Sequence, residues 1–231
     1  MRKHHVPIGW PDRDPRHYRF PIPNSVWEHQ IKPTEFVILS YLCYCRTQGN
    51  KLVPLSAKAI AQAVHMTAGT VKKYLSLLTH RRIVTNKCSL TSEFQCEHSK
   101  NFFTLPNEVF LLNLPPSAFI VYAYLLLVED RKTHTCHPSY NTIATETGMS
   151  KNTVIKSVGA LLDKGLIVME YSRYVDQNGM KWKGNNLYTI LPIRQAMNSF
   201  YQQQLQRLEL NTQHNRLRER QATALESRAE L

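Results

Sequence analysis

Cysteine is scarce in this chain, and long apolar runs are missing. Only 5 of the 231 residues are cysteine, and no two form a CxxC pair. An odd number of dispersed cysteines does not fit a disulfide framework and indicates a reducing cytosol. No apolar run approaches the length that spans a bilayer, and the N-terminus lacks the apolar segment of a secretory signal. We therefore expect a cytoplasmic protein with no membrane contact.

The sequence also lacks the motifs of common enzymes and cofactor sites. It has no GxxxxGK[ST] loop for nucleotides and no GxSxG nucleophile motif, and its carboxylates are scattered. Two groups, Cys88 with Cys96 and His98, and His134 with Cys136 and His137, lack the closely paired ligands of zinc sites. We expect no enzyme activity, cofactor, metal or small-molecule ligand.

Acidic residues are few relative to basic ones. The chain has 17 Asp+Glu against 29 Lys+Arg, a net charge of +12, which favours a polyanionic partner, most often nucleic acid. Residues 1–113 carry a net +8, whereas 114–192 and 193–231 carry +2 each. Part of the excess lies in a Pro-rich arm, residues 1–19. This arm is either a solvated tail or a contact to DNA phosphates or a minor groove, and the sequence leaves both open.

An internal repeat organises the chain. The segment 20–84 aligns with 103–167 without a gap, and about a quarter of the aligned pairs are identical. The matches include Pro33/Pro116, Ser56/Ser139 and Met66/Met149. We therefore expect four parts: the arm 1–19, a domain over 20–102, a second copy over 103–192, and a tail over 193–231.

The second copy has the clearer pattern of elements. Apolar spacing predicts helices over 117–128, 140–147 and 151–164. Ser139 and Ser150 are predicted N-caps, and Gly148 and Gly165 end the second and third helices. Strands are predicted over 166–174 and 186–190, joined by a hairpin turn at Asn178-Gly179. The order is a helix-turn-helix followed by a β-hairpin wing.

The segment 137–168 resembles bacterial winged helix-turn-helix domains, found in transcription regulators and in plasmid or phage replication proteins. The motifs that carry the resemblance are S-x-x-x-I-A from Ser139, G-M-S from Gly148, T-V at 153–154, and L-x-x-x-G-L-I from Leu161. The resemblance implies a mostly α fold with small β wings (α+β): two tandem winged helix-turn-helix domains and then a long C-terminal helix.

The resemblance also implies a function. We expect sequence-specific binding of double-stranded DNA in a bacterial cytoplasm, and transcriptional regulation on a phage, plasmid or other mobile element. The alternatives are a replication initiator that binds origin repeats, or an accessory DNA-binding protein in conjugation or recombination.

The first copy follows the same plan with two departures. Helices are predicted over 33–45, 56–64 and 68–80, followed by a strand over 83–88 and a longer wing loop over 89–100. His65 stands where the second copy has Gly148, and Arg82 where it has Gly165. Either these residues take backbone angles unfavourable for them, or the first copy turns differently.

Recognition helices contact DNA through their N-terminal half and their outward face. In the second copy these residues are predicted to be Ser150, Lys151, Asn152, Thr153, Lys156 and Ser157. In the first copy they are Thr67, Thr70, Lys72, Lys73 and Tyr74, beside Ala68 and Gly69, whose side chains make no hydrogen bonds. We therefore expect the second copy to carry most of the base reading. At the second wing, Lys181, Trp182 and Lys183 are predicted to contact DNA, with Trp182 packed back on the domain as an equal alternative.

The tail is predicted to be one long helix. Residues 193–231 contain no Gly or Pro and seven Gln, and apolar residues recur every three or four positions up to Leu208. The first half is expected to pack on the domains or on a second subunit. Two alternatives remain open: a homodimer formed through this helix, or a monomer whose two copies mimic a dimer.

Overall fold

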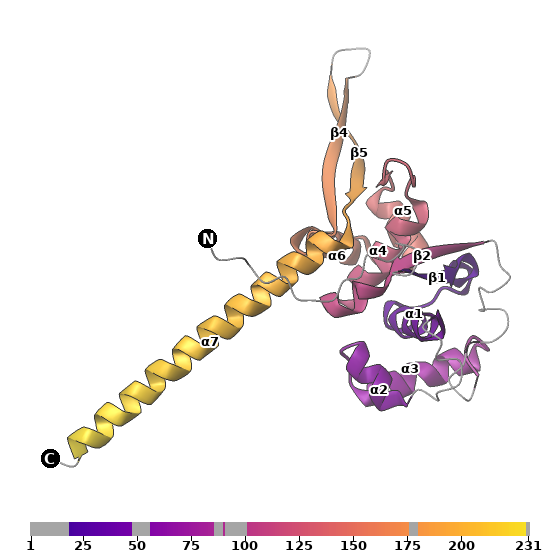
Figure 1. The fold of residues 1–231 in the computed structure, drawn as a ribbon. Coiled ribbons are helices and arrows are strands. Elements are labelled where there is room, and N and C mark those ends of the chain that lie inside the picture. The colour runs from indigo at the N-terminus through magenta and orange to yellow at the C-terminus, as the bar shows by residue number, and fades with distance from the viewer. Residues whose placement is uncertain (1–18, 48–55, 86–89, 91–100, 176–179, 230–231) are drawn as a thin grey trace.

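The computed structural model describes residues 19–47, 56–85, 90, 101–175 and 180–229 (Figure 1). A helical body carries a β-hairpin on one side, and a long helix projects from the body (Figure 1). The prediction of a mostly α fold with small β elements, a winged helix-turn-helix and a long C-terminal helix is confirmed. Among the described residues, no helix combines the length and apolarity needed to cross a bilayer.

The elements before and after residue 101 follow the same order. The first series is β1 (Arg19–Pro23), the 3-10 helix η2 (Asn24–His29), α1 (Pro33–Thr47), α2 (Ala57–Ala63) and α3 (Ala68–His80). The second is β2 (Phe102–Pro106), η4 (Asn107–Leu112), α4 (Pro116–Val128), β3 (Thr135–Cys136), α5 (Tyr140–Thr147), α6 (Lys151–Asp163), β4 (Ile167–Val175) and β5 (Lys181–Ile190). The starts of corresponding elements are aligned with each other by the internal repeat, if the alignment is extended by one residue to include Arg19.

Helix α4 lies at the centre of the molecule. It is apolar around its whole circumference, and its residues from Ala118 to Leu126 are all buried, as expected of a helix covered on every side. It packs against α1 on one side and against α5 and α6 on another. One continuous cluster of buried apolar side chains joins both series of elements, from Phe20 to Met197.

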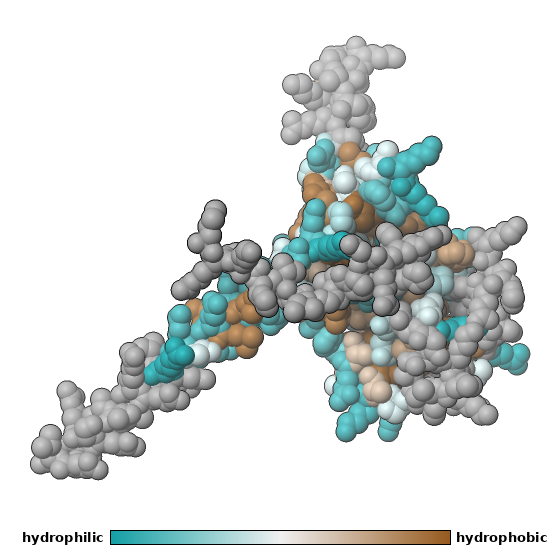
Figure 2. Space-filling model, in the orientation of Figure 1, coloured by the Kyte–Doolittle hydropathy of each residue, from teal (hydrophilic) through white to brown (hydrophobic). Residues whose placement is uncertain are grey.

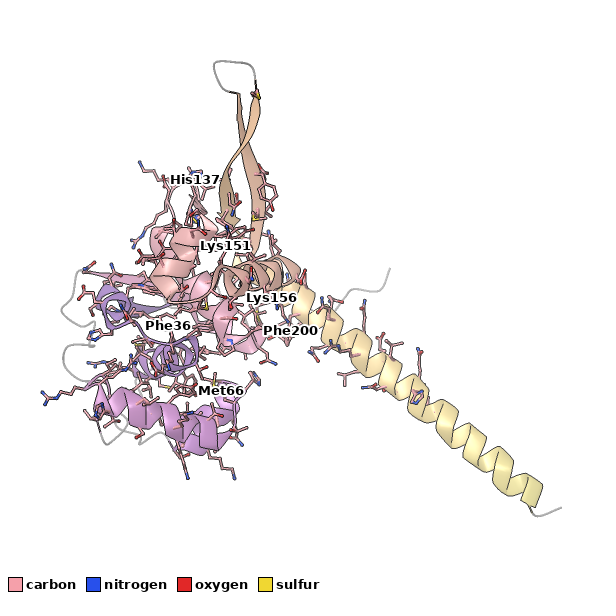
Figure 3. All side chains as sticks on the ribbon, turned by 180° about the vertical axis from the view of Figure 1, so that it is seen from behind. Phe36, Met66, His137, Lys151, Lys156 and Phe200 are labelled. Atoms are coloured by element: carbon pink, nitrogen blue, oxygen red, sulfur yellow. The ribbon has the colours of Figure 1, made fainter. Side chains whose placement is uncertain are left out.

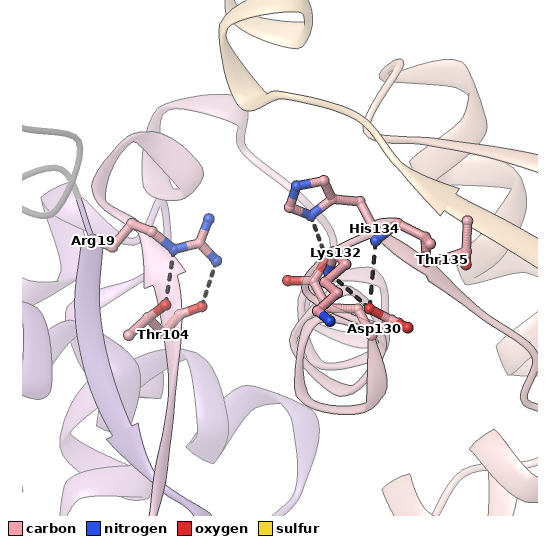
Figure 4. A network of polar contacts seen from close by, with 8 residues as sticks. Arg19, Thr104, Asp130, Lys132, His134 and Thr135 are labelled. Atoms are coloured by element: carbon pink, nitrogen blue, oxygen red, sulfur yellow. Dashed lines mark hydrogen bonds and ion pairs between the residues drawn. The ribbon is translucent and has the colours of Figure 1, made fainter.

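The N-terminal strand β1 was not predicted. It pairs antiparallel with β2, so that residues 19–23 lie against 102–106. Arg19 lies at this ribbon and donates from Nε to Thr104 Oγ1 and from its guanidinium to the Thr104 carbonyl, both at 2.8 Å (Figure 4). The sequence assigned Arg19 to the basic arm, but its guanidinium is used to join the two strands.

The wing is a three-stranded sheet in the order β3-β5-β4. Strand β4 has the predicted length, shifted by one residue, whereas β5 begins five residues earlier than predicted. The pairing of the two strands continues out to Arg173↔Lys183, Tyr174↔Trp182 and Val175↔Lys181. Lys181, Trp182 and Lys183 therefore lie in strand β5 and not in the turn. Their side chains, and the predicted turn at Asn178-Gly179, lie outside the described residues. In the first series the predicted wing over 89–100 also lies outside them, except for the bridge Val84↔Leu90.

Helix α7 (Ile193–Ala229) confirms the predicted tail helix. Its first turns pack on the body, where Ala196 and Met197 are 2% exposed. Lys164 lies 5.4 Å from the ring centroid of Phe200, near the point where the helix leaves the body. Beyond this point apolar side chains reach the surface of the projecting helix (Figure 2). These are Tyr201, Leu205, Leu208 and Leu210, which are 44–64% exposed.

Candidate nucleic-acid interface

In the second series, a side chain caps the start of each helix of the helix-turn-helix, and a glycine in the left-handed conformation follows the end of each. Ser139 Oγ accepts from the Thr142 N–H at 3.0 Å, and Ser150 Oγ from the Thr153 N–H at 3.2 Å. Each bond satisfies an amide that the first turn of a helix leaves free. Between the two helices, Gly148 has φ +64°, and the Met149 N–H bonds to the Ala144 carbonyl at 3.0 Å. The turn thus sets the angle at which α6 leaves α5.

The first series uses the same turns with different residues. His65 has φ 54° and Arg82 has φ 59°, close to the 64° of Gly148 and Gly165. The hydrogen bonds correspond as well: Met66 N–H to Ala61 carbonyl at 2.9 Å, and Ile83 N–H to Leu78 carbonyl at 3.0 Å. Of the two alternatives that the sequence left open, the first is correct. The chain keeps the turn and places non-glycine residues in the left-handed region.

The left-handed conformation of Gly148 predicts how substitutions there change the stability of the protein. Gly148→Ala is expected to destabilise the protein by about 1 kcal/mol, because only backbone strain is added; no atom lies within 4 Å of the new Cβ. The matched control is Gly159→Ala in α6, where the new Cβ also meets nothing within 4 Å. There alanine should stabilise the helix by up to about 1 kcal/mol. Urea unfolding of both variants measures the difference, and equal effects would contradict the assigned turn.

Helix α6 presents a mixed polar and apolar face to solvent. Lys151, Asn152, Ile155 and Lys156 are exposed, whereas Val154, Val158 and Leu161 are buried. Figure 3 shows Lys151 and Lys156 on this helix. In chemical terms, two such cations can contact phosphates, an amide can pair with adenine in bidentate fashion, and an aliphatic side chain can contact a thymine methyl. Ile155, 42% exposed, was missed in the sequence, because an apolar residue in an amphipathic helix is assigned to the core.

Ser157 does not lie on this face. It is 2% exposed, and its hydroxyl donates to the Thr153 carbonyl one turn earlier at 2.8 Å. Its place in the sequence, next to Lys156, suggested an outward residue. The helical period instead puts it beside Val154 and Val158, where a small hydroxyl fits because it bonds within its own helix.

Ser150 is the N-cap of α6, and its hydroxyl lies beside that of Thr153 in the first turn. Their hydroxyl oxygens lie 2.8 Å apart, and Thr67 and Thr70 form the same pair at 2.8 Å at the start of α3. Each pair holds the N-terminal turn in place. Contact of any of these four hydroxyls with DNA stays a prediction.

Helix α3 presents a different surface at the equivalent positions. Gly69, Lys72, Lys73 and Ser76 are exposed, where α6 has Asn152, Ile155, Lys156 and Gly159. Lys73 Nζ lies 5.9 Å from the ring centroid of the half-buried Tyr74. On this face of α3, the two lysines are therefore the only side chains able to pair with a base in bidentate fashion. The face has no amide equivalent to Asn152.

The base of the wing is locked to the helix-turn-helix. Tyr140 at the start of α5 donates to Met169 Sδ in β4 at 3.4 Å. Asn186 in β5 donates to the hydroxyl of Tyr188 at 2.8 Å, and both residues are buried. The first contact joins the wing to α5, and the second lies within β5.

The loop between α4 and β3 is a compact turn. Asp130 accepts at Oδ1 from the Lys132 N–H at 2.7 Å, and its carbonyl accepts from the His134 N–H at 2.7 Å (Figure 4).

Burial, with the Glu129 carboxylate nearby, raises the pKa of Cys136 to about 12, so its thiol keeps its proton. In the part of the chain that the structure describes, no three His, Cys, Asp or Glu side chains are grouped to hold a metal ion. Cys88, Cys96 and His98 lie outside that part.

Comparison with known proteins identifies the same unit. A family model described as a helix-turn-helix domain matches residues 112–167, which run from the end of η4 through α6 to the start of β4. A solved structure of a possible transcriptional regulator from Methanosarcina mazei Go1 matches at 20% identity and a TM-score of 0.33, covering 48% of this chain and 89% of that one. No curated protein sequence matches. Residues 112–167 are therefore similar to the helix-turn-helix family, and the β-hairpin that follows α6 in the structure completes the arrangement of a winged helix-turn-helix.

Proposed function

We propose that the chain binds double-stranded DNA in a sequence-specific manner, with α6 in the major groove as the main reading helix. The observation that carries the proposal is the exposed face of Lys151, Asn152, Ile155 and Lys156, set on a capped helix within the residues that match the helix-turn-helix family. A recognition helix of this kind contacts base edges through its N-terminal part.

The two series of elements support a division of labour. The net charge of +8 in residues 1–113 exceeds the +2 in 114–192, and the α3 face carries lysines without an amide. We propose that α3 mainly attracts and positions the phosphate backbone while α6 reads bases. The domain boundaries 20–102 and 103–192 belong to the same proposal, as do DNA contacts by the arm 1–18 and by Lys181, Trp182 and Lys183.

Salt dependence tests the backbone contacts. The logarithm of the binding constant should fall linearly with the logarithm of salt concentration, because bound lysines release counterions from DNA. Lys156→Ala and Lys73→Ala should each reduce the magnitude of that slope by about 1. Fluorescence anisotropy with a labelled duplex over a series of salt concentrations measures it. The control is Lys32→Ala, an exposed lysine outside both recognition helices, which should leave the slope unchanged. A slope near zero for the parent chain would contradict the proposal.

We assign the DNA binding to transcriptional control on a mobile element, with replication initiation as the second candidate. Two helix-turn-helix units in one chain favour a long site, which either role can use. A reporter assay with the bound site placed in a promoter, and a replication assay with the site placed in an origin-less plasmid, distinguish the two. Replication that depends on the protein would move the assignment to the second candidate.

The exposed apolar side chains of α7 suggest a homodimer. Tyr201, Leu205 and Leu208 follow one another at helical spacing on one face, whereas Leu210 lies on another. We propose that this face packs against α7 of a second chain. The start of the helix, where Ala196 and Met197 are buried and Phe200 is half-buried, fixes its direction relative to the body.

Light scattering tests the dimer. Leu205→Ser/Leu208→Ser is expected to convert a dimer to a monomer at micromolar concentration, because it removes apolar area from the contact, while binding to a single DNA site is kept. Leu210→Ser, equally exposed on another face, should leave the mass unchanged. A monomeric parent chain, or a double variant of unchanged mass, would contradict the contact.

A further inference from the structure

The pairing of β1 with β2 has an internal symmetry. Pro21 corresponds to Thr104 in the repeat alignment, and in the ribbon it pairs with Thr104 itself. On either side of this pair the partners exchange: Phe20 lies opposite Leu105, and Ile22 opposite Phe103. If each residue is replaced by its counterpart in the repeat, the pair Phe20–Leu105 becomes the pair Phe103–Ile22, and the reverse. The ribbon therefore has a local two-fold axis through the central pair.

The aromatic contacts between the two series follow the same axis. Phe36 and Phe119 correspond to each other, and their ring centroids lie 6.0 Å apart where α1 crosses α4. Other contacts in this cluster have mates in which the two series exchange roles. The mated pairs are Trp27–Tyr124 at 5.6 Å with Tyr41–Phe110 at 5.3 Å, Trp27–Phe103 at 6.0 Å with Phe20–Phe110 at 5.7 Å, and Trp27–Phe36 at 5.5 Å with Phe110–Phe119 at 5.6 Å.

The two halves therefore meet in an isologous interface, as the subunits of a two-fold dimer do. The axis that exchanges β1 with β2 and Phe36 with Phe119 also exchanges α3 with α6, because each packs on its own member of the α1–α4 pair. Helix-turn-helix dimers present their recognition helices in this relation, and their sites are inverted repeats because a duplex maps onto itself about the same kind of axis.

The two reading faces differ in chemistry. Lys73 and Lys156 correspond, as do the capping pairs Thr67–Thr70 and Ser150–Thr153. At the other equivalent positions the residues are unlike: α3 has Ala68, Gly69 and Lys72 where α6 has Lys151, Asn152 and Ile155. The shared residues suit the sugar–phosphate backbone, and the unlike residues suit different bases.

We infer that a single chain reads an inverted pair of unlike half-sites, with the specific half-site under α6 and a weakly specified one under α3, related by the internal two-fold axis. The inference rests on the proposed DNA binding and adds the form of the site. A direct repeat of two similar half-sites is the arrangement that it excludes. It holds whether or not α7 joins two chains, since both reading helices belong to one chain.

A variant that makes the two reading faces alike tests the inference. Ala68→Lys/Gly69→Asn/Lys72→Ile gives α3 the three residues that distinguish α6. It is compared with the parent chain on duplexes that carry the half-site bound by α6 once, twice in inverted orientation, and twice in direct orientation, with the two copies about one helical turn of DNA apart and the spacing varied in single base-pair steps. Thermal unfolding of the free variant shows that it remains folded.

The variant is expected to bind the best inverted duplex roughly tenfold or more tightly than the single half-site, because three base-reading positions are added. The parent chain should show a much smaller gain, and neither chain should gain on the direct repeats. A gain on direct repeats, or no gain on any double site by a folded variant that still binds the single half-site, would overturn the inference and leave the proposed function standing. Failure of the parent chain to prefer the half-site over random DNA would overturn the proposed function itself.

Discussion

Replacing Asn152 by alanine should weaken binding to the preferred duplex by about 1–3 kcal/mol, the usual contribution of a bidentate base contact. This corresponds to roughly a 5- to 150-fold increase in the dissociation constant. Asn152 is exposed near the start of α6, where a recognition helix approaches base edges, and an amide is the side chain that pairs with adenine in bidentate fashion. The loss should be confined to the specific site. Binding to random DNA should change little, because that binding depends on phosphates.

The comparison with other substitutions makes this prediction specific. Lys151→Ala should also weaken specific binding, but with a change in salt slope if Lys151 contacts a phosphate, and without one if it contacts a guanine. Lys32→Ala is the control, because Lys32 lies near Arg81 at the C-terminal end of α3. The backbone N–H of Lys32 donates to the Glu35 carboxylate, and the Arg81 guanidinium lies 3.5 Å from the same carboxylate. If Asn152→Ala and Lys151→Ala bind a selected site as the parent chain does, α6 is not the reading helix.

Replacing Phe119 by alanine should lower the free energy of unfolding by about 3–5 kcal/mol, the range for a large aromatic side chain removed from a core. Phe119 is 3% exposed and contacts Phe36 across the α1–α4 junction and Phe110 in η4. Because one core joins both series of elements, the loss should destabilise both halves together.

Urea unfolding followed by circular dichroism and by tryptophan fluorescence measures this effect. Both signals should give one coincident transition in the parent chain and in the variant, with the midpoint shifted. Phe102→Ala is the control: Phe102 is 37% exposed in the neighbouring strand β2, so it should cost less than about 1 kcal/mol. Two separate transitions in the Phe119→Ala variant would show that the halves fold independently and would contradict the shared core.

The helices of the winged helix-turn-helix were predictable because individual capping residues determine where each helix begins and ends. Serine caps, left-handed glycines and apolar spacing placed α5 at 140–147 as observed and α6 within one residue of its observed end. The same spacing rules placed α3 at 68–80 as observed, although His65 and Arg82 occupy its flanking turns. Local patterns of this kind are strong because each residue meets its partner within four positions.

The ribbon of β1 and β2 was not predictable from local pattern. Two prolines in Arg19–Pro23 disfavour a strand in local pattern, and its partner strand, Phe102–Pro106, belongs to the other copy of the repeat. Only tertiary pairing, completed by Arg19 and Thr104, makes this segment a strand. The same limit applies to Ile155, whose exposure is set by the packing of α6 on α4, and to β5, whose early start depends on pairing with residues 173–175.

The central claim is that α6 reads base sequence through its N-terminal half, and selection of bound duplexes from a random library tests it most directly. The parent chain and the Lys151→Ala/Asn152→Ala variant are selected in parallel at the same salt concentration, and the enriched sequences are compared. The parent chain should enrich one motif, and the variant should lose the preference at the base pairs of one half-site while it keeps its salt-dependent affinity for DNA. Enrichment of the same motif by both proteins, or of no motif by the parent chain, would contradict the claim.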